Sequence, residues 1–503
     1  MSFLPPLPPV VLPPDLERDL RRTNPWWEGN PVPPQPSTRR HLVRQIHQRL
    51  QKRLAPAVVV RGTRQIGKTT ALLQVIGDLL AAGVLPTHIF YIQADELPAL
   101  SAFLEPILRL ADWYEETILG KTLNEAAHAG EKTYLFFDEI QNLKAWAPQI
   151  KFLVDHSATQ AVITGSSALR IEQGRDSLAG RITTLEAGVL SLTEIASFRG
   201  LDLGPPFLPD NGLKALTEID FWHALREHGR NPAVSSSRDQ AFSWFSERGG
   251  YPLAYQQTEG SWNELADQLN ENVIKRVIQH DLRVGDRGRK RDSVLLEELF
   301  RLACRYVGQA PDRQVFVREI QRTLAASIQP LRIGQYLKFL GDTLLLRLVP
   351  ALEIRLKKSV GGPKICLADH GLRASWLQEV VPLDPTALQK EPHLSLLAGR
   401  IAESVTGATL ATIPNLDLAH LPARVGEPEV DFILTVGTKR IPLEVKYQRR
   451  IDPLADTEGL RTFLEKSVNN APLGLLITQS DFEGVALDPR IVAMPLSTFM
   501  LLR

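Results

Sequence analysis

The sequence predicts an α/β protein in which a parallel-sheet domain comes first and further domains follow. Apolar strand patterns alternate with helical patterns between residue 56 and about residue 200, and this alternation is typical of a parallel sheet covered by helices on both faces. The 503 residues are too many for one core, which favours about three domains. The 44% apolar and 23% charged residues are those of an ordinary globular protein. The strands that we expect in the first sheet are 57–60, 88–92, 134–137, 161–164 and 182–185.

A glycine-rich loop follows the first of these strands. Residues 62–69 read GTRQIGKT, the pattern of a phosphate-binding loop, and apolar residues at helical spacing follow it. Gly62 and Gly67 would let backbone N–H groups turn toward phosphate oxygens. Lys68 would bring positive charge to the outer phosphates, and the Thr69 hydroxyl would bind Mg²⁺. The alternative is an incidental glycine-rich turn. The residues expected to contact ATP here are Gly62, Thr63, Gln65, Ile66, Gly67, Lys68, Thr69 and Thr70.

Two acids close the apolar strand 134–137. Acids at the carboxyl end of a parallel strand lie at the edge where ligands bind. Asp138 is therefore expected to hold Mg²⁺ and Glu139 to polarise the attacking water, the catalytic role. The alternative for both is a solvated acidic turn.

Polar and basic residues follow the fourth strand. Ser166 would lie beside the two acids and contact the γ-phosphate, or it would cap the next helix. Arg181 is the best candidate for a catalytic arginine finger or sensor, acting in cis or from a neighbouring subunit. Arg170 and Arg175 are weaker candidates, and an ordinary solvated arginine is the alternative for all three.

The bulk numbers restrict the class of partner and the compartment. A net charge of +1 argues against a strongly electrostatic partner for the whole protein. Cys304 and Cys366 are the only cysteines, so no disulfide framework is expected, in keeping with a reducing cytoplasm. No apolar run approaches a membrane span, and the proline-rich N-terminus lacks the pattern of a signal peptide. We expect a cytoplasmic protein without a membrane partner.

The regions around the core have their own patterns. Residues 1–38 are expected to form an extended proline-rich arm, in which Trp26 and Trp27 pack against the core or beside the nucleotide base. An amphipathic helix is expected over 39–54. Residues 201–240 are rich in loop residues, and 241–285 are helical in pattern. The basic segment 276–291 would contact phosphates or serve as a solvated linker.

Residues 293–346 suggest three helices followed by an apolar strand pair, the outline of a winged helix-turn-helix. The second helix is expected over 315–324, the third over 331–340, and the wing from 344. Arg332, Gln335 and Lys338 on the third helix could reach base edges or phosphates. The alternative is a plain packing module.

A carboxylate–lysine pattern lies near the C-terminus. Strands 430–436 and 439–447 flank Gly437-Thr438, a two-residue turn that would place Asp431 opposite Glu444. Lys446 would share the face of Glu444, and Glu403 on a preceding helix would complete a Mg²⁺ site. Pro442 implies an edge strand or bulge. The alternative is a solvated hairpin.

These motifs together resemble a family of bacterial and archaeal AAA-type P-loop ATPases with a C-terminal domain similar to restriction endonucleases. The residues that carry the resemblance are NPWW (24–27), RGTRQIGKTT (61–70), FFDEIQ (136–141), ITGSSA (163–168), SLAGR (177–181), GGYP (249–252), LADHGLR (367–373), GRIAE (399–403), VDF (430–432) and LEVK (443–446). The resemblance implies nucleotide-binding Lys68 and Thr69, magnesium-binding Asp138, catalytic Glu139, and a nuclease-like set of Glu403, Asp431, Glu444 and Lys446. The long arm and the loop-rich stretch depart from the family pattern.

The expected domains follow from the motifs and the resemblance. They are the arm 1–38, an AAA-type P-loop core 39–200, an insertion and helical lid 201–285, a winged-helix-like domain 286–385 and a restriction-endonuclease-like domain 386–503.

The expected function is ATP binding and hydrolysis coupled to a Mg²⁺-dependent nuclease-like or nucleic-acid-binding C-terminal domain. In that case the C-terminal catalytic residues are Glu444 and Lys446, and Glu403, Asp431 and Glu444 hold the metal. The alternative is a nucleotide switch whose C-terminal domain only binds a protein or nucleic acid. A small-molecule kinase fits less well, because two further domains follow the core. The expected cofactors are ATP and Mg²⁺, and the partners left open are DNA, RNA, another protein or further copies of the chain.

Overall fold

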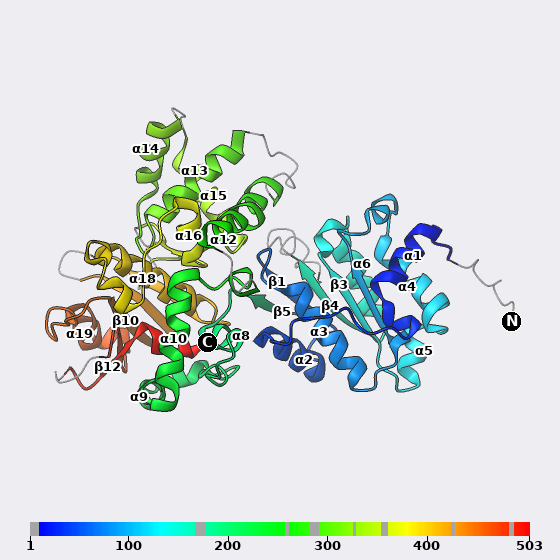
Figure 1. The fold of residues 1–503 in the computed structure, drawn as a ribbon, viewed down its shortest axis with the longest axis horizontal. Helices are drawn as coiled ribbons and strands as arrows, with labels where there is room; N and C mark the ends of the chain where they lie inside the picture. The colour runs from blue at the N-terminus through cyan, green and yellow to red at the C-terminus, as the bar shows by residue number, and fades with distance from the viewer. Residues whose placement is uncertain are drawn as a thin grey trace. The chain divides into compact units, whose positions relative to one another are not determined.

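The computed structural model describes residues 10–165, 178–256, 261–281, 291–324, 328–353, 361–423, 428–481 and 487–503. The chain divides into two compact units, Met1–Ala187 and Gly188–Arg503 (Figure 1). Over the described ranges, no helix is long and apolar enough to cross a membrane.

A parallel sheet of five strands forms the centre of the first unit. Its order is β2-β3-β4-β1-β5, and all neighbouring strands are parallel. The five strands predicted from the sequence, and their parallel arrangement, are therefore confirmed. The strands are β1 (Ala57–Gly62), β2 (Ile89–Gln93), β3 (Tyr134–Asp138), β4 (Gln160–Gly165) and β5 (Ile182–Ala187).

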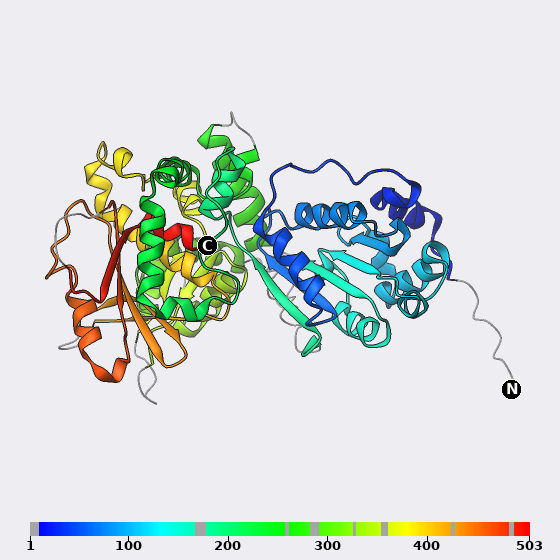
Figure 2. The ribbon, with the colours of Figure 1, turned by 90° about the horizontal axis from the view of Figure 1, so that it is seen from below.

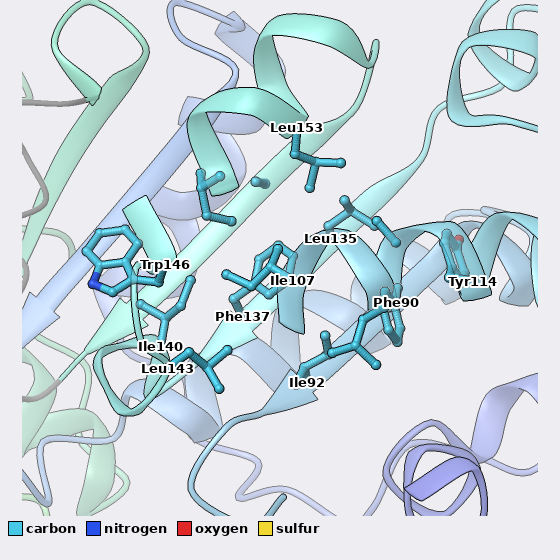
Figure 3. Close-up of a cluster of buried hydrophobic side chains, with 14 of the residues drawn as sticks. Phe90, Ile92, Ile107, Tyr114, Leu135, Phe137, Ile140, Leu143, Trp146 and Leu153 are labelled. Atoms are coloured by element: carbon cyan, nitrogen blue, oxygen red, sulfur yellow. The ribbon is translucent and has the colours of Figure 1, made fainter. Parts of the chain in front are cut away.

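Helices cover both faces of this sheet, as predicted. Helix α2 contacts α3, β1 and β5, while α4 contacts α6. Side chains alternate along a strand, so Leu135 and Phe137 of β3 point to one face, where they pack against residues of α4 and α6 (Figure 3). Each such fully buried side chain contributes about 1.5–3 kcal/mol. The helices are α2 (His41–Lys52), α3 (Lys68–Ala81), α4 (Pro106–Tyr114), α5 (Leu123–His128) and α6 (Trp146–His156), with shorter turns at η2 (Pro86–His88), η3 (Pro98–Ala102), η4 (Glu115–Leu119) and η5 (Ile140–Asn142).

The N-terminal arm is not extended throughout. Residues Pro14–Thr23 form helix α1, and Pro25–Glu28 form the short helix η1. Leu12, Leu16 and Leu20 recur every four residues and join the hydrophobic core, which explains why a helix forms here. The indole nitrogens of Trp26 and Trp27 both donate to the carbonyl of Ile89, at 3.1 and 2.9 Å. Of the two expectations for these tryptophans, packing against the core is confirmed.

The second unit opens with helices where loops were expected. Residues 201–218 contain the short helix η7 (Leu213–Thr217), but α9 and α10 fill 219–248, so the loop-rich expectation is wrong there. These helices pack within the second unit, α9 and α10 both against α20. The elements are α8 (Leu192–Phe198), α9 (Ile219–Arg230), α10 (Pro232–Arg248), α11 (Leu253–Gln256), α12 (Trp262–Leu269), η8 (Asn270–Lys275) and η9 (Val277–Asp281).

Three helices and a strand pair follow, with the bounds close to those predicted. Helices α13, α14 and α15 contact one another, and β6 pairs antiparallel with β7. Most of the basic segment 276–291 lies outside the described residues. The elements are α13 (Arg291–Arg305), α14 (Arg313–Leu324), α15 (Pro330–Asp342), β6 (Leu346–Val349), β7 (Lys364–Leu367), α16 (His370–Leu377) and α17 (Pro385–Leu388).

A mixed five-stranded sheet of order β12-β11-β10-β9-β8 closes the chain, coloured orange to red in Figure 2. The predicted hairpin register is confirmed, because Val436 pairs with Lys439 and Phe432 with Leu443. Pro442 lies in the central strand β10, but the pairing of β10 with β11 begins only at Leu443. The remaining elements are η11 (Pro392–Leu394), α18 (Ser395–Ala411), β8 (Asp417–Leu421), β9 (Val430–Val436), β10 (Lys439–Lys446), α19 (Glu458–Glu465), η12 (Ser467–Asn469), β11 (Gly474–Thr478), β12 (Ile491–Pro495), α20 (Leu496–Phe499) and η13 (Met500–Leu502).

The motifs GGYP and LADHGLR meet inside the second unit. The buried carboxylate of Asp369 accepts hydrogen bonds from the backbone N–H groups of Gly250 and Gly371. Gly249 has φ +75, and a Cβ there would collide with the Asp369 carboxylate. These two motifs therefore stabilise a buried turn.

Candidate functional site

The phosphate-binding loop joins the carboxyl end of β1 to the N-terminus of α3. Gly67 has φ +84 and caps α3, a conformation that favours glycine. Gly62 has no room for a side chain, since a Cβ would lie 2.6 Å from the carbonyl oxygen of Ala187. The Lys68 ammonium donates to the carbonyls of Gly62 and Thr63 at 3.0 and 2.9 Å. The lysine thus points back across its own loop, toward the place where phosphates would lie.

The other predicted loop residues differ in exposure. Thr63 and Ile66 are buried, Gln65 is exposed with φ +59, and Thr70 lies in the first turn of α3. Arg40, at the N-cap of α2, donates to the carbonyl of Ile66 at 2.6 Å, a support that the sequence did not reveal.

The carboxylate of Asp138, at the end of β3, accepts hydrogen bonds from side chains of β2, β4 and the first turn of α3. Thr69 Oγ1 donates to its Oδ2 at 2.6 Å, and Tyr91 of β2 donates to the same oxygen at 3.3 Å. Thr164 of β4 donates to Oδ1. Burial raises the pKa of Asp138, while the hydrogen bonds from Thr164 and Thr69 act in the opposite direction. A hydroxyl and a carboxylate in contact are oxygen donors of the kind that Mg²⁺ takes, so these residues fit the ion.

Glu139 follows this carboxylate and lies near the lysine. Its Oε1 is 3.7 Å from Lys68 Nζ, and its side chain is 13% exposed. Its backbone has φ +50, which is uncommon for a residue other than glycine and is found at functional sites. Gln141 Nε2 donates to Glu139 Oε2 at 2.5 Å. Burial lowers the pKa of Lys68, and Glu139 partly opposes this.

The polar residue beside the acids is Thr164 of β4, two residues before the predicted Ser166. Its Oγ1 also accepts from the backbone N–H of Glu139 at 3.2 Å. Ser166, Arg170 and Arg175 lie outside the described residues. Tyr91 and Thr164 lie in β2 and β4, the strands on either side of β3. The expected pairing of these parallel strands could have identified both residues.

Arg181 and the phosphate-binding loop lie at opposite ends of the paired strands β1 and β5. Arg181 precedes β5, whose first residue, Ile182, pairs with Ala57 at the start of β1. About 17 Å of strand therefore separates it from the loop, and its Nε is paired with Asp155 at 2.5 Å. This placement does not fit a finger or sensor acting in cis.

The predicted DNA-facing residues of α15 share an exposed side of the helix. Arg332, Gln335 and Lys338 are all exposed, while Ile333, Leu337 and Leu340 are buried. Arg332 donates to the Tyr336 hydroxyl, and Lys338 pairs with Asp342 at 2.8 Å.

The four residues predicted near the C-terminus lie on neighbouring elements of the second unit, α18, β9 and β10. Glu403, Asp431 and Glu444 are buried. Asp431 Oδ2 accepts from the backbone N–H of Val445 at 2.9 Å, and Lys446 Nζ lies 3.3 Å from Glu444 Oε2.

A further lysine, which sequence reasoning missed, joins this group. Lys364 of β7 is buried, and its Nζ lies 2.5 Å from Asp431 Oδ1 and 3.2 Å from Glu403 Oε2. A lone cation inside the apolar run 363–368 was the signal that could have identified it.

A divalent ion does not fit this second site as it stands. The Lys364 ammonium fills the space between Asp431 and Glu403. Over the described residues, no group of three or more His, Cys, Asp or Glu side chains is arranged to hold a metal ion.

Two family models match parts of the chain. Residues 54–196 match the AAA domain, and residues 240–381 match a domain of unknown function (DUF8612). The second match spans α10 to α16, and residues 386–503, where a restriction-endonuclease-like domain was expected, lie outside both matches.

Relatives and solved structures give more distant matches. An uncharacterized protein of Haemophilus influenzae is 24% identical over 319 residues, which cover 63% of this chain and 68% of that protein. The uncharacterized protein MJ1637 of Methanocaldococcus jannaschii is 33% identical over 119 residues, 24% of this chain and 23% of that protein. The Walker-type ATPase of Pyrococcus abyssi aligns over 69% of this chain and 99% of its own, with 15% identity and a TM-score of 0.37. Cdc6p of Pyrobaculum aerophilum aligns over 71% and 97%, with 12% identity and a TM-score of 0.25.

The family match over residues 54–196 agrees with the contacts that Lys68 and Thr69 make in the phosphate-binding loop. Residues 54–196, most of which lie in the first unit, match an AAA-type domain and carry a P-loop.

Proposed function

We propose that the first unit binds Mg²⁺-ATP and hydrolyses it. The observation that carries this is the contact of Thr69 Oγ1 with Asp138 Oδ2 at 2.6 Å, beside a lysine that crosses the phosphate loop. The bound Mg²⁺ would neutralise charge on the phosphates. Thr69 and Asp138 would hold it, and the Lys68 ammonium would exchange its two loop carbonyls for phosphate oxygens.

Glu139 is proposed to orient and polarise the attacking water. Its carboxylate is held between Gln141 and Lys68, so its direction is set before ATP arrives. Thr164 holds the backbone of Glu139 and the carboxylate of Asp138 together.

Two substitutions test this proposal. Lys68→Ala is expected to abolish ATP binding, and Glu139→Gln to keep binding while lowering kcat by about 10²–10⁴. Lys132→Ala, which changes an exposed lysine before β3, is the control and is expected to leave both unchanged. Full hydrolysis by Glu139→Gln would show that Glu139 is not the water-activating group.

An arginine finger is proposed to act between copies of the chain, because Arg181 lies too far from the loop of its own domain. Specific ATPase activity would then rise with protein concentration and be lost in Arg181→Ala. If the specific activity does not depend on protein concentration and is unchanged in Arg181→Ala, Arg181 is not a catalytic residue.

We further propose that the nucleotide state controls the second unit, which binds a protein or a nucleic acid through its C-terminal α/β region or through α15. Nucleic acid is the favoured partner, because α15 exposes Arg332, Gln335 and Lys338. This helix belongs to the region that we propose to resemble a winged helix. Substituting all three by alanine should weaken binding of duplex DNA and reduce its dependence on salt.

A second candidate is a Mg²⁺-dependent phosphodiesterase in a restriction-endonuclease-like domain; it requires that Mg²⁺ displace the Lys364 ammonium from between Asp431 and Glu403. The meeting of Asp431, Glu444 and Lys446 at one end of β9 and β10 favours it. The test is cleavage of single- and double-stranded DNA and RNA with Mg²⁺ or Mn²⁺, and its loss in Lys446→Ala. If no substrate is cut, this candidate fails while the ATPase proposal stands.

A further inference from the structure

The carboxylates of the second unit surround a buried ammonium. We use the name acidic centre for Glu403, Glu429, Asp431 and Glu444. Lys364 Nζ lies 2.5 Å from Asp431 Oδ1, 3.2 Å from Glu403 Oε2 and 3.8 Å from Glu429 Oε1. The Lys364 side chain is only 1% exposed, and its ammonium also lies 5.1 Å from the centre of the Phe432 ring.

The charges of the acidic centre are nearly balanced by the chain itself. Against its four carboxylates stand Lys364, Lys446 at 3.3 Å from Glu444, and Arg400 at 3.3 Å from Glu403. The centre therefore has little uncompensated negative charge with which to attract a further cation.

The ammonium also occupies the space that a metal ion would need. Mg²⁺ holds its oxygen ligands at 2.0–2.1 Å, so an ion that bridged Asp431 and Glu403 would have to displace the Lys364 Nζ. The backbone of Lys364 is fixed in β7, where it pairs with Val349, and Ile365 N donates to Gln309 O at 2.8 Å. Removing the side chain from the centre would leave buried carboxylates unpaired, which is strongly unfavourable.

We propose that the Lys364 ammonium takes the place of a divalent cation in the acidic centre, so that the native chain binds no Mg²⁺ or Mn²⁺ there. Lys364 comes from β7, before α18 and the hairpin that carry the carboxylates, and it therefore links the strand pair β6–β7 to the C-terminal sheet. The inference does not depend on ATP hydrolysis by the first unit.

The experiment counts Mn²⁺ bound by the full-length, nucleotide-free protein, with electron paramagnetic resonance as the readout. All variants carry Lys68→Ala, which removes the phosphate-binding lysine of the first unit. With Lys364 intact, we expect no Mn²⁺ site tighter than millimolar. Lys364→Met keeps the length of the side chain and removes its charge, and it is expected to create one Mn²⁺ site that Asp431→Asn removes.

Lys446→Met is the matched control. It also removes a lysine that pairs with a carboxylate of the acidic centre, Glu444, but the side chain of Lys446 is 33% exposed. We expect it to create no site. A Mn²⁺ site in the Lys364-containing protein that Asp431→Asn abolishes would overturn the proposal. So would a folded Lys364→Met protein that takes up no Mn²⁺, or equal uptake by Lys446→Met. If Lys364→Met does not fold, the count in the Lys364-containing protein, with and without Asp431→Asn, decides the question.

Discussion

Asp138 is a carboxylate whose two oxygens are held by hydroxyl groups of different strands. Thr69 and Tyr91 donate to one oxygen, and Thr164 donates to the other. It is completely buried, so its orientation depends on these donors rather than on water. Thr164 is also bonded to the backbone of Glu139, which makes it a positioning residue for both acids.

Thr164→Val tests this role at a single hydroxyl. Valine keeps the shape but removes the donor to Asp138 and the acceptor for Glu139. Because a hydrogen bond to a charged group is worth about 1.5–3 kcal/mol, we expect kcat to fall by about ten- to a hundredfold. ATP affinity should change little, since Lys68 and Thr69 are untouched. Steady-state hydrolysis and equilibrium ATP binding measure the two effects, and Thr183→Val in β5 is the control. A loss of affinity as large as the loss of kcat would contradict a positioning role.

His420 makes the stability of the second unit depend on pH. Burial, and to a smaller extent the charge of Lys364, lower the pKa of His420 from 6.5 to about 4, although its hydrogen bond to the Gly362 carbonyl and the charge of Asp431 act in the opposite direction. Below pH 6.5 the unfolded chain takes up a proton that the folded chain refuses, so stability falls as the pH drops from 6.5 to about 4. The full difference corresponds to about 3 kcal/mol.

We expect His420→Gln to flatten this part of the profile of unfolding free energy against pH, with denaturant unfolding followed between pH 4 and pH 7. His393→Gln, an exposed histidine, is the control. An unchanged slope in His420→Gln would assign the acid sensitivity to other groups.

The turn between α10 and α11 requires a residue without a side chain at position 249. Gly249→Ala would place a methyl group against the Asp369 carboxylate in a backbone conformation of φ +75. Gly200 has the same φ with nothing within 4 Å of the added Cβ, so Gly200→Ala measures the backbone cost alone. We expect about 1 kcal/mol for Gly200→Ala and at least twice that for Gly249→Ala, as a lower unfolding temperature of the second unit. Equal losses would mean that Asp369 moves aside without cost.

The elements that the sequence predicted are those whose signal is local. The strands of the first sheet are short apolar runs, and the C-terminal hairpin register follows from its two-residue turn. Helix α1 was missed because five prolines precede it in the first 13 residues, although Leu12, Leu16 and Leu20 have helical spacing. Helix α9 was missed because Gly and Pro residues just before it suggested that the loop continues.

In the candidate sites, too, the sequence predicted the residues that belong to local motifs and missed a residue that depends on long-range packing. The loop, Thr69 and Asp138 follow from motifs, and the structure brings them into contact. Lys364 could not be paired with Asp431 from sequence, because 67 residues separate them and no pattern joins β7 to β9. Contacts of this kind depend on the packing of whole elements, which a local pattern does not contain.

At the scale of the molecule, the segment that follows the AAA-type domain belongs structurally to the second unit. Phe207 N and Leu208 N donate to Leu501 O and Leu502 O at 2.9 and 3.1 Å, so this segment is tied to the end of the chain. Arg238 of α10 donates to Thr498 Oγ1 at 2.6 Å within the same unit. A nucleotide signal that leaves the first unit through residue 188 would therefore reach elements that are hydrogen-bonded to α20 and η13 at the end of the chain.

Hydrogen exchange on the Glu139→Gln protein tests this coupling. ATP present at a hundred times its dissociation constant stabilises the state that binds it by about 2.7 kcal/mol, so amides of the first unit should exchange more slowly. If the nucleotide state controls the second unit, amides in α8, α9 and α10 should also change their exchange rates. By linkage, a partner bound to the second unit must then alter ATP affinity by the same factor. Lys68→Ala, which should bind no ATP, is the control and should show neither change. Slower exchange confined to residues 10–187 would contradict the coupling while leaving ATP binding intact.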